Sequence, residues 1–418
     1  MPLKKKPSYA IIYAAALSLL SGAPFLFAAE ATPTAVAPSA TPAAADAPAG
    51  AGGRQGGGRG GRGGPMTPED QAKIAKLATL PPWKPGVGEG DYRMMPDATK
   101  TPPYNDLTNP AYPPAPENAP RDGVPKGKVD TFQIPLVGSK FFPPGVGGRG
   151  RGGAAAAPAP APATDGAAVP GPMREGNVYI PAGYVAGTPA PLLICHDAMG
   201  MHDNKPAPYL PDILDNLIAA KRLPPMIAVM VMPGSQGQRS YEYDTVSGRF
   251  AEFLEAEVLP VVEQKYNVKF SKDPDARGVI GGSSGGAAAM AMAWFHPELY
   301  HRVLVFSPTF TALRRDPENA PHGAWEFHEN FIPKSPAKPL RIWLEVGERD
   351  NGSTGPDAGM NNWVFASIHT AEVLKAKGYH YQFVYAPQAV HTDRPVRSQT
   401  LAPALEWLWK DYKPAANY

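Results

Sequence analysis

The feature that most constrains how this chain can fold is the motif GGSSGG at residues 281–286. A short apolar stretch ending at Ile280 precedes it, and an Ala/Met-rich stretch of helical composition, residues 287–294, follows it. Strand, Gly-Ser-Gly turn and helix in this order are typical of a nucleophile elbow, which holds a serine hydroxyl above the carboxyl end of a sheet. The turn needs glycine because its strand and helix pass so close that larger side chains would collide.

Two serines fit the turn, because Gly-x-Ser-x-Gly can be centred on Ser283 or on Ser284. The predicted strand ends close to Gly281, which puts Ser283 at the apex and makes Ser284 the first helical residue. Spacing therefore favours Ser283 and leaves Ser284 as the alternative. A plain Gly/Ser turn without chemistry is the alternative to the elbow itself.

The rest of the second half alternates between short apolar stretches and longer amphipathic ones. This alternation predicts a mostly parallel sheet covered by helices on both faces, with any chemistry at the carboxyl ends of the strands. The predicted strands are residues 129–142, 177–180, 191–195, 227–232, 278–281, 302–306, 340–346 and 381–385. The predicted helices are residues 210–221, 247–266, 286–295, 363–377 and 399–411.

The first half has a different composition, since proline (52 residues) and glycine (43 residues) concentrate before residue 175. Much of it cannot form a packed core. Residues 1–29 combine lysines, an apolar stretch and small residues, as a cleavable signal peptide does; a single membrane anchor is the alternative. Residues 30–65 read as a disordered Ala/Pro and Gly/Arg linker.

A short helix is predicted to begin at Thr67-Pro68-Glu69-Asp70, within an otherwise irregular segment at 66–125. Residues 126–412 are predicted to form a single α/β domain, with a low-complexity insertion at 145–172. The net charge of +2 does not favour a nucleic-acid partner. Cys195 is the only cysteine, so an exported form of the chain has no internal disulfide.

A serine nucleophile needs a base to take its proton and an acid to orient that base, in the chain order serine, acid, histidine. Asp350 follows the predicted strand 340–346, and His391 follows the predicted strand 381–385. We therefore predict Asp350 as the acid and His391 as the base, although a loop acid or histidine alone is usually a solvated surface residue. The competing candidates are Glu345, Glu348, Asp357, His369 and His380.

The oxyanion of a tetrahedral intermediate needs two backbone N–H donors. One is expected from Ser284, the residue after the nucleophile. The other should follow an early strand, and the exit after Cys195 favours Met199, with Ala198 as the second choice.

The same strand exit contains His196, His202 and Asp203. The two histidines are six residues apart in a Gly-containing loop, which is not a strict ligand spacing, so no metal site is predicted there. Further along, RSYEYD at 239–244 follows another strand exit. Arg239 and Glu242 are predicted to bind a polar substrate, with an internal salt bridge that stabilises the loop as the alternative.

Several motifs between residues 123 and 412 resemble the enterochelin-esterase-like branch of the esterase D family, which also contains feruloyl and acetyl-xylan carbohydrate esterases. The matching stretches are GVPKGKV at 123–129, VYIPAGY at 178–184, RSYEYD at 239–244, GGSSGG at 281–286, GERD at 347–350, Asn362-Trp363, and LEWLWKDY at 405–412.

The resemblance implies an α/β-hydrolase fold and assigns roles to single residues. The two glycines after Gly-x-Ser-x select Ser283 as nucleophile. The last position of GERD makes Asp350 the acid, and the last strand exit makes His391 the base. Trp363, in the matching Asn362-Trp363 pair, joins the expected substrate-binding residues.

These observations predict an exported serine ester hydrolase, periplasmic or secreted, that needs no cofactor and has no membrane span after signal cleavage. The expected substrates are carbohydrate or phenolic-acid esters, or a siderophore-type lactone. Two alternatives stay open. One is an acyltransferase with the same triad, and the other is a non-catalytic envelope-binding protein whose Gly/Arg segments bind while the hydrolase domain is a scaffold.

Overall fold

The computed structural model describes residues 64–100, 110–145, 171–196, 209–234 and 238–413. The predicted signal peptide (1–29), almost all of the predicted linker (30–65) and most of the predicted insertion (145–172) lie outside these residues. None of the described helices is both long and apolar enough to cross a membrane.

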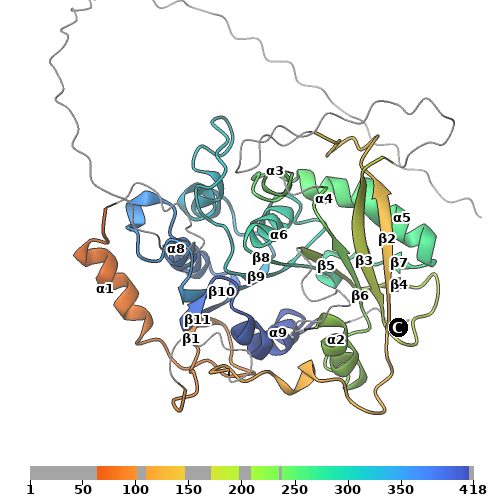
Figure 1. Cartoon of the computed structure of the whole chain (residues 1–418), viewed down its shortest axis with the longest axis horizontal. Helices are drawn as coiled ribbons and strands as arrows, with labels where there is room; N and C mark the ends of the chain where they lie inside the picture. Colours follow the sequence, from red (N-terminus) through yellow and green to blue (C-terminus); the bar gives the residue numbers. More distant parts are fainter. Residues whose placement is uncertain (1–63, 101–109, 146–170, 197–208, 235–237, 414–418) are drawn as a thin grey trace, which may run out of the picture. The chain divides into compact units, whose positions relative to one another are not determined.

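The described residues form a nine-stranded sheet in the order β1-β11-β10-β9-β8-β5-β6-β3-β2 (Figure 1). Neighbouring strands from β1 to β6 run parallel, whereas β3 runs antiparallel to both β6 and β2. The strands are β1 (Gly90–Arg93), β2 (Lys128–Pro135), β3 (Met173–Ile180), β5 (Leu192–His196), β6 (Ile227–Val231), β8 (Arg277–Gly282), β9 (Arg302–Phe306), β10 (Arg341–Arg349) and β11 (His380–Val390). A small separate pair joins β4 (Pro189–Ala190) to β7 (Lys269–Phe270).

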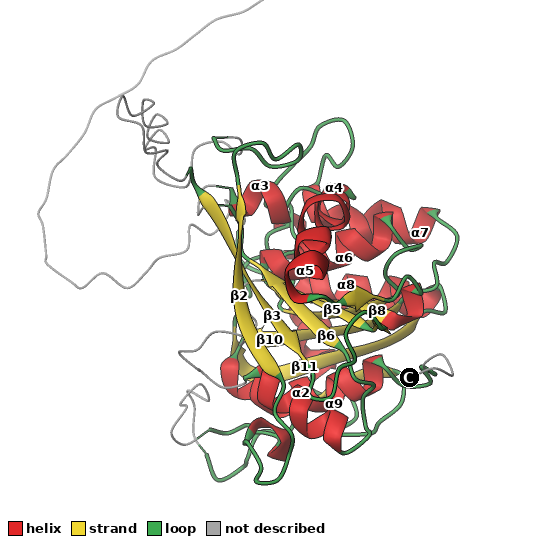
Figure 2. Ribbon diagram, turned by 90° about the vertical axis from the view of Figure 1, so that its right-hand side faces the viewer, coloured by secondary structure: helices red, strands yellow, loops and turns green. Residues whose placement is uncertain are grey.

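Helices cover both faces of the sheet (Figure 2). The longer ones are α1 (Pro68–Leu77), α2 (Leu210–Ala219), α5 (Leu259–Tyr266), α6 (Ser284–Phe295), α8 (Trp363–Ala376) and α9 (Arg394–Leu408). The shorter ones are α3 (Arg239–Tyr243), α4 (Arg249–Phe253) and α7 (Ile332–Lys334), with single turns or π segments at Pro116–Asn118, Leu254–Val258, Pro274–Ala276, Gly323–Trp325, Phe327–Phe331 and Asp357–Gly359.

The central strands are buried on both faces, as their continuous apolar runs predict. Every residue of β5, β6, β8 and β9 is buried. One core cluster joins the sheet to α4, α6 and α8, and the other joins it to α2 and α9. The mostly parallel sheet between two helical layers has the predicted architecture of an α/β-hydrolase.

The predicted strand 129–142 ends at Pro135 as β2, and three boundaries next to the candidate site also differ from those predicted. β11 continues to Val390, so most of the expected loop before His391 is extended strand. β10 continues to Arg349, which puts Asp350 directly after it. α9 begins at Arg394, five residues before the predicted start, because the Asp393 carboxylate caps it by accepting from the Val396 N–H.

The segment at 66–125 is more regular than its composition predicts. α1 begins with a capping box between Thr67 and Asp70, at the predicted position. The unpredicted part is β1, which pairs in parallel with β11 and becomes an edge strand of the main sheet. Trp83 packs edge-on against Trp343 of β10, with 5.9 Å between the ring centroids.

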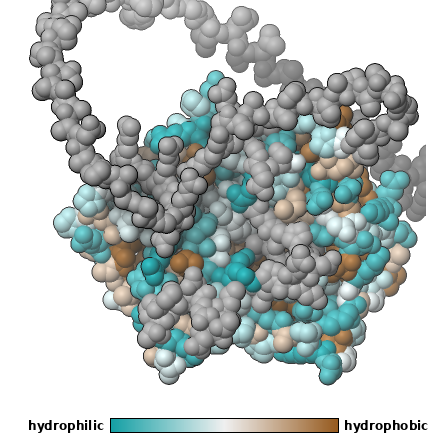
Figure 3. All heavy atoms as spheres, viewed as in Figure 1, coloured by the Kyte–Doolittle hydropathy of each residue, from teal (hydrophilic) through white to brown (hydrophobic). Residues whose placement is uncertain are grey.

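On the face seen in Figure 3, hydrophobic residues among those described are scattered between hydrophilic ones.

Candidate active site

The motif GGSSGG forms a strained turn between β8 and α6. Ser283 has φ 56° and ψ −128°, a left-handed conformation that is costly for a residue with a Cβ atom. A Cβ atom on Gly281 would lie 2.2 Å from the carbonyl oxygen of Gly285, so the close approach requires glycine there. The turn is stabilised by a hydrogen bond from the Ser283 N–H to the Phe306 carbonyl of β9 (3.0 Å). The strand, turn and helix therefore have the geometry of a nucleophile elbow.

Ser283, His391 and Asp350 form a continuous hydrogen-bonded chain. Nε2 of His391 lies 2.9 Å from Oγ of Ser283, and Nδ1 lies 2.6 Å from Oδ1 of Asp350. A carboxylate accepts, so Nδ1 carries the ring proton and Nε2 is the acceptor that faces the serine hydroxyl. The side chain of Asp350 is fully buried, and Oδ1 also accepts from the Asn351 N–H at 2.7 Å. The structure thus brings together the three residues predicted for the triad.

The competing acids and histidines have other partners. Asp357 and His369 bind each other, with 2.8 Å between Oδ2 and Nε2, and His380 contacts Glu89 at the other end of β11. Glu348 accepts hydrogen bonds from Gln388. Glu345 lies inside β10, where burial raises the pKa of its carboxyl group to about 8.

A sequence comparison decides the family. The family described as "Putative esterase" matches residues 168–408, more than half of the chain. The chain belongs to this esterase family. The match agrees with the resemblance at the level of the esterase family. No curated protein matched the chain.

Solved structures similar to this chain include an enterochelin esterase, a ferric enterobactin esterase and a ferulic acid esterase. The enterochelin esterase from Shigella flexneri is 24% identical (TM-score 0.43), with 57% of this chain and 55% of that chain covered. The ferric enterobactin esterase from Salmonella typhimurium is 20% identical (TM-score 0.46; 68% and 59% covered). A ferulic acid esterase from Anaeromyces mucronatus, solved with ferulic acid, is 16% identical (TM-score 0.47; 71% and 95% covered). The esterase thus spans little more than half the length of the enterobactin esterases it matches.

Of the two expected oxyanion donors, Met199 lies outside the described residues. Ser284 is the first residue of α6, where backbone N–H groups have no partner within the helix. Its hydroxyl accepts a hydrogen bond from Nη1 of Arg239, at 2.9 Å. Arg239 lies over the ring of Tyr243, whose hydroxyl donates to the Val231 carbonyl of β6. The predicted substrate-binding arginine therefore lies beside the residue that follows the nucleophile.

Sequence reasoning did not single out Asp244, which lies in the same RSYEYD motif. Burial raises the pKa of this carboxyl group above its ordinary value, against the opposing effect of the Ser284 and Ser240 hydroxyls and of Arg239. The sequence signal that could have identified Asp244 is its place as the last residue of RSYEYD, five residues after Arg239.

The prediction that Glu242 binds substrate is not supported by its position. Glu242 is only 2% exposed, and its two carboxylate oxygens accept from Nη1 and Nη2 of Arg174, at 2.6 and 2.9 Å. The Gly234 N–H donates to the same carboxylate at 3.1 Å. The alternative of an internal salt bridge is therefore the correct one, with Arg174 of β3 in place of Arg239 as the cation. Nothing near Arg174 in the sequence points to this pairing.

Trp363 begins α8 and packs against His391, the predicted base. Its ring lies edge-on to His391, with 6.0 Å between ring centroids and an interplanar angle of 85°, and the residue is 9% exposed. Asn362 caps the helix through its side-chain oxygen, which accepts from the N–H groups of Val364 and Phe365. The matching Asn-Trp pair thus places an aromatic ring beside the imidazole.

The histidines considered for a metal do not assemble a site among the described residues. His196 is fully buried between Tyr243 and Phe250, where burial lowers its pKa to about 3 and keeps the ring neutral. His202 and Asp203 lie outside the described residues. A separate group, His322, Glu326 and Glu329, has ligand atoms within 4.8 Å of one another. Nδ1 of His322 lies 2.5 Å from Glu329, so these side chains already bind each other.

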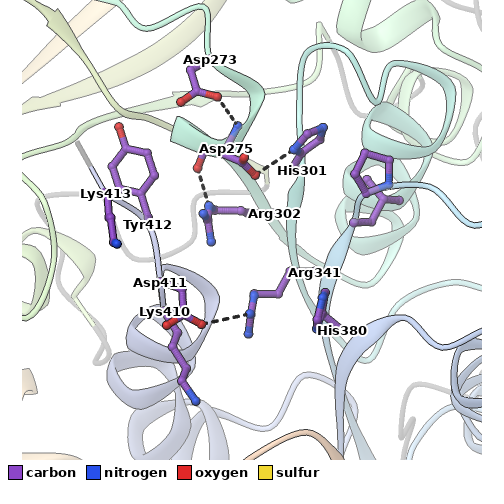
Figure 4. Close-up of a pocket in the computed structure, with 12 residues that line it drawn as sticks. Asp273, Asp275, His301, Arg302, Arg341, His380, Lys410, Asp411, Tyr412 and Lys413 are labelled. Atoms are coloured by element: carbon purple, nitrogen blue, oxygen red, sulfur yellow. Dashed lines mark hydrogen bonds and ion pairs between the residues drawn. The ribbon is translucent and has the colours of Figure 1, made fainter. Parts of the chain in front are cut away.

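A cavity of about 410 Å³ lies at the amino ends of β9, β10 and β11 (Figure 4). Its lining includes Arg302, Arg341 and His380, the first residues of β9, β10 and β11. Ser283, Asp350 and His391 follow the carboxyl ends of β8, β10 and β11. The cavity is therefore separate from the candidate active site.

Proposed function

We propose that the esterase is a serine hydrolase in which Ser283 is the nucleophile, His391 the general base and Asp350 the residue that orients the imidazole. The single observation that supports this most strongly is the hydrogen-bonded chain from Asp350 through His391 to Ser283, with contacts of 2.6 and 2.9 Å. The strained φ of Ser283 supports the same role, because such strain concentrates at functional sites.

The proposed reaction has two steps. Oγ of Ser283 attacks the ester carbonyl while Nε2 of His391 takes its proton, and the resulting imidazolium gives that proton to the departing alcohol. A water molecule then attacks the acyl-serine, with His391 again taking the proton and returning it to Oγ as the acid leaves. Asp350 stays ionised throughout and stabilises the imidazolium.

The oxyanion of each intermediate is proposed to bind the backbone N–H groups of Ser284 and Met199. Ser284 at the beginning of α6 suits this role, because the helix dipole favours negative charge at its amino end. Arg239, within 2.9 Å of the Ser284 hydroxyl, is proposed to contact polar groups of the substrate.

We propose a carbohydrate or phenolic-acid ester, or a siderophore-type lactone, as the substrate of an exported enzyme. The guanidinium of Arg239 beside the nucleophile supports a substrate with hydroxyl or acidic groups. The sequence of residues 1–29 supports export to the periplasm or the medium. Mass spectrometry of the protein recovered from these fractions tests this. If all of the protein still begins at residue 1, signal cleavage is contradicted.

The deciding experiment compares the parent enzyme with Ser283→Ala and Ser284→Ala. The substrates are short-chain p-nitrophenyl esters, methyl ferulate and an acetylated xylan. We expect Ser283→Ala to lose at least about 10³-fold in kcat. We expect Ser284→Ala to lose far less, because its backbone N–H remains. The reverse order would move the nucleophile to Ser284, and equal activity of all three would overturn the triad. A new ester formed with an added alcohol, in place of free acid, would indicate an acyltransferase.

A further inference from the structure

The segment that carries the proposed base, residues 386–392, has an unusual backbone. We refer to it as the base segment. Gln388, three residues before His391, has φ 59°, and Thr392 directly after it has φ 47°. Left-handed conformations of non-glycine residues persist only where the surroundings enforce them. The contacts that enforce this backbone therefore contribute to where the imidazole lies.

Glu348 holds the base segment from the neighbouring strand. Its Oε2 accepts from the backbone N–H of Gln388 at 2.6 Å and from the Gln388 side-chain Nε2 at 2.9 Å. It also accepts from the hydroxyl of Tyr385, and burial together with this contact raises the pKa of that phenol. Glu348 is the second-last residue of β10, and Asp350 directly follows the strand. One carboxylate thus holds the backbone before His391, and the other holds its ring.

Tyr112 holds the same peptide unit from the other side. Its ring is fully buried, and its hydroxyl donates to the carbonyl of Pro387 at 2.5 Å. The Pro387 carbonyl and the Gln388 N–H belong to one planar peptide group, so Tyr112 and Glu348 hold both of its polar atoms. A peptide plane held at both atoms cannot rotate without breaking a hydrogen bond.

Tyr112 is itself well supported, although it is 275 residues away from Pro387 in sequence. The Met94 N–H donates to the Tyr385 carbonyl at 2.7 Å, directly after the pairing of β1 with β11. On the other side, the N–H of Ala115 and the side-chain amide of Asn118 donate to the Ser398 carbonyl in α9, at 2.8 and 2.7 Å. The segment before β2 therefore contacts the elements on both sides of His391.

From this geometry we propose that Glu348 and Tyr112 are positioning residues for His391. Together they hold the Pro387–Gln388 peptide plane, and that plane sets the distance from the imidazole to Ser283. The proposal rests on the proposed function, since it assumes that His391 is the base. It also means that the segment at 66–125 contributes to catalysis, because Tyr112 belongs to it.

The test measures kcat and KM for p-nitrophenyl acetate in Glu348→Ala, Glu348→Gln and Tyr112→Phe. A displacement of a catalytic group by about 1 Å can cost on the order of 10²-fold. We expect kcat to fall about 10-fold or more in Glu348→Ala and about 3-fold in Tyr112→Phe, with KM within about twofold of the parent. Glu348→Gln keeps a carbonyl acceptor for the Gln388 N–H, so it should recover much of the loss.

The matched controls are Tyr92→Phe and Glu318→Ala. Tyr92 is a half-buried tyrosine whose hydroxyl donates to the Glu89 carbonyl, and Glu318 is an exposed acid. Both should keep the parental kcat. The rate of inactivation by a serine-directed fluorophosphonate gives a second readout, and it should fall in parallel with kcat. A role limited to stability would lower the melting temperature and leave kcat and this rate unchanged, which would overturn the proposal.

The double variant Tyr112→Phe with Glu348→Ala separates a shared role from two independent ones. Because both side chains hold one peptide plane, its loss in kcat should be smaller than the product of the two single losses. Losses that multiply would contradict the shared role. A parent enzyme that depends on Ser283 but not on Glu348 or Tyr112 would overturn only this inference, whereas a parent indifferent to Ser283→Ala would overturn the proposed function itself.

Discussion

The nucleophile elbow and the base segment carry the two residues of the proposed proton transfer, but they are built in opposite ways. The elbow takes its strain from six consecutive residues, and its glycines make room for the close pass of β8 and α6. The base segment has no glycine, and its left-handed residues depend on Tyr112, Glu348 and Ser307, three separate parts of the chain. A local motif can thus be recognised in one stretch of sequence, whereas a distributed one cannot.

The largest expected effect concerns the contact between His391, in the base segment, and the Asp350 carboxylate. Asp350→Asn should lower kcat by about 10⁴-fold, because an amide no longer selects the tautomer that leaves Nε2 free to accept. Hydrolysis of p-nitrophenyl acetate measures it. Asp357→Asn is the control, since Asp357 makes a similar contact with His369. Similar losses in both variants would contradict the assignment of the acid.

The elbow should fail through sterics rather than through lost chemistry. In Gly281→Ala the new Cβ atom would lie 2.2 Å from the Gly285 carbonyl oxygen, so α6 must shift. We expect a loss of at least about 2 kcal/mol in the free energy of unfolding, together with a large loss of activity. Gly88→Ala is the control, because its added Cβ meets nothing within 4 Å. Urea unfolding gives the comparison, and equal stability of both variants would refute the steric argument.

The smallest effect concerns Glu345, the buried acid inside β10, the strand that Asp350 follows. Burial raises the pKa of Glu345 to about 8, so the native state holds a proton that the unfolded state releases near pH 4.5. Stability from this group is therefore fully present below about pH 4.5 and is lost progressively as the pH rises from there to about 8. The advantage of Glu345→Gln over the parent should therefore be larger at pH 9 than at pH 6, by about 2 kcal/mol. Urea unfolding at both pH values measures it, and a gain that is the same at both would contradict the titration.

Much of the candidate site was predictable because each part of it follows a strand that can be recognised locally. Ser283 follows an apolar strand and precedes a helix, and Asp350 and His391 follow the next suitable strands in the expected order. The extension of β11 to Val390 was not predictable from composition. It depends on pairing with β10, in which the register shifts between Gly347 and Arg349.

The errors concern side chains whose partners are distant in sequence. Glu242 was expected to face the substrate and instead binds Arg174, 68 residues away. The Pro-rich segment before residue 125 was expected to be irregular outside its first helix, yet it supplies β1 and Tyr112. Secondary-structure propensity describes the conformation that a stretch of sequence favours alone. Which of its polar groups form hydrogen bonds is decided by the distant segments against which it is buried.

The sequence alone determined the elbow, the chain order of serine, acid and histidine, and the layered α/β architecture. These depend on glycine sterics and on hydrophobic periodicity, which act over a few residues. Only the tertiary structure decided which carboxylate holds the backbone before the imidazole, and that an N-terminal tyrosine shares that task. Each of these is a hydrogen bond between segments up to 275 residues apart, and it exists only after the sheet has brought them together.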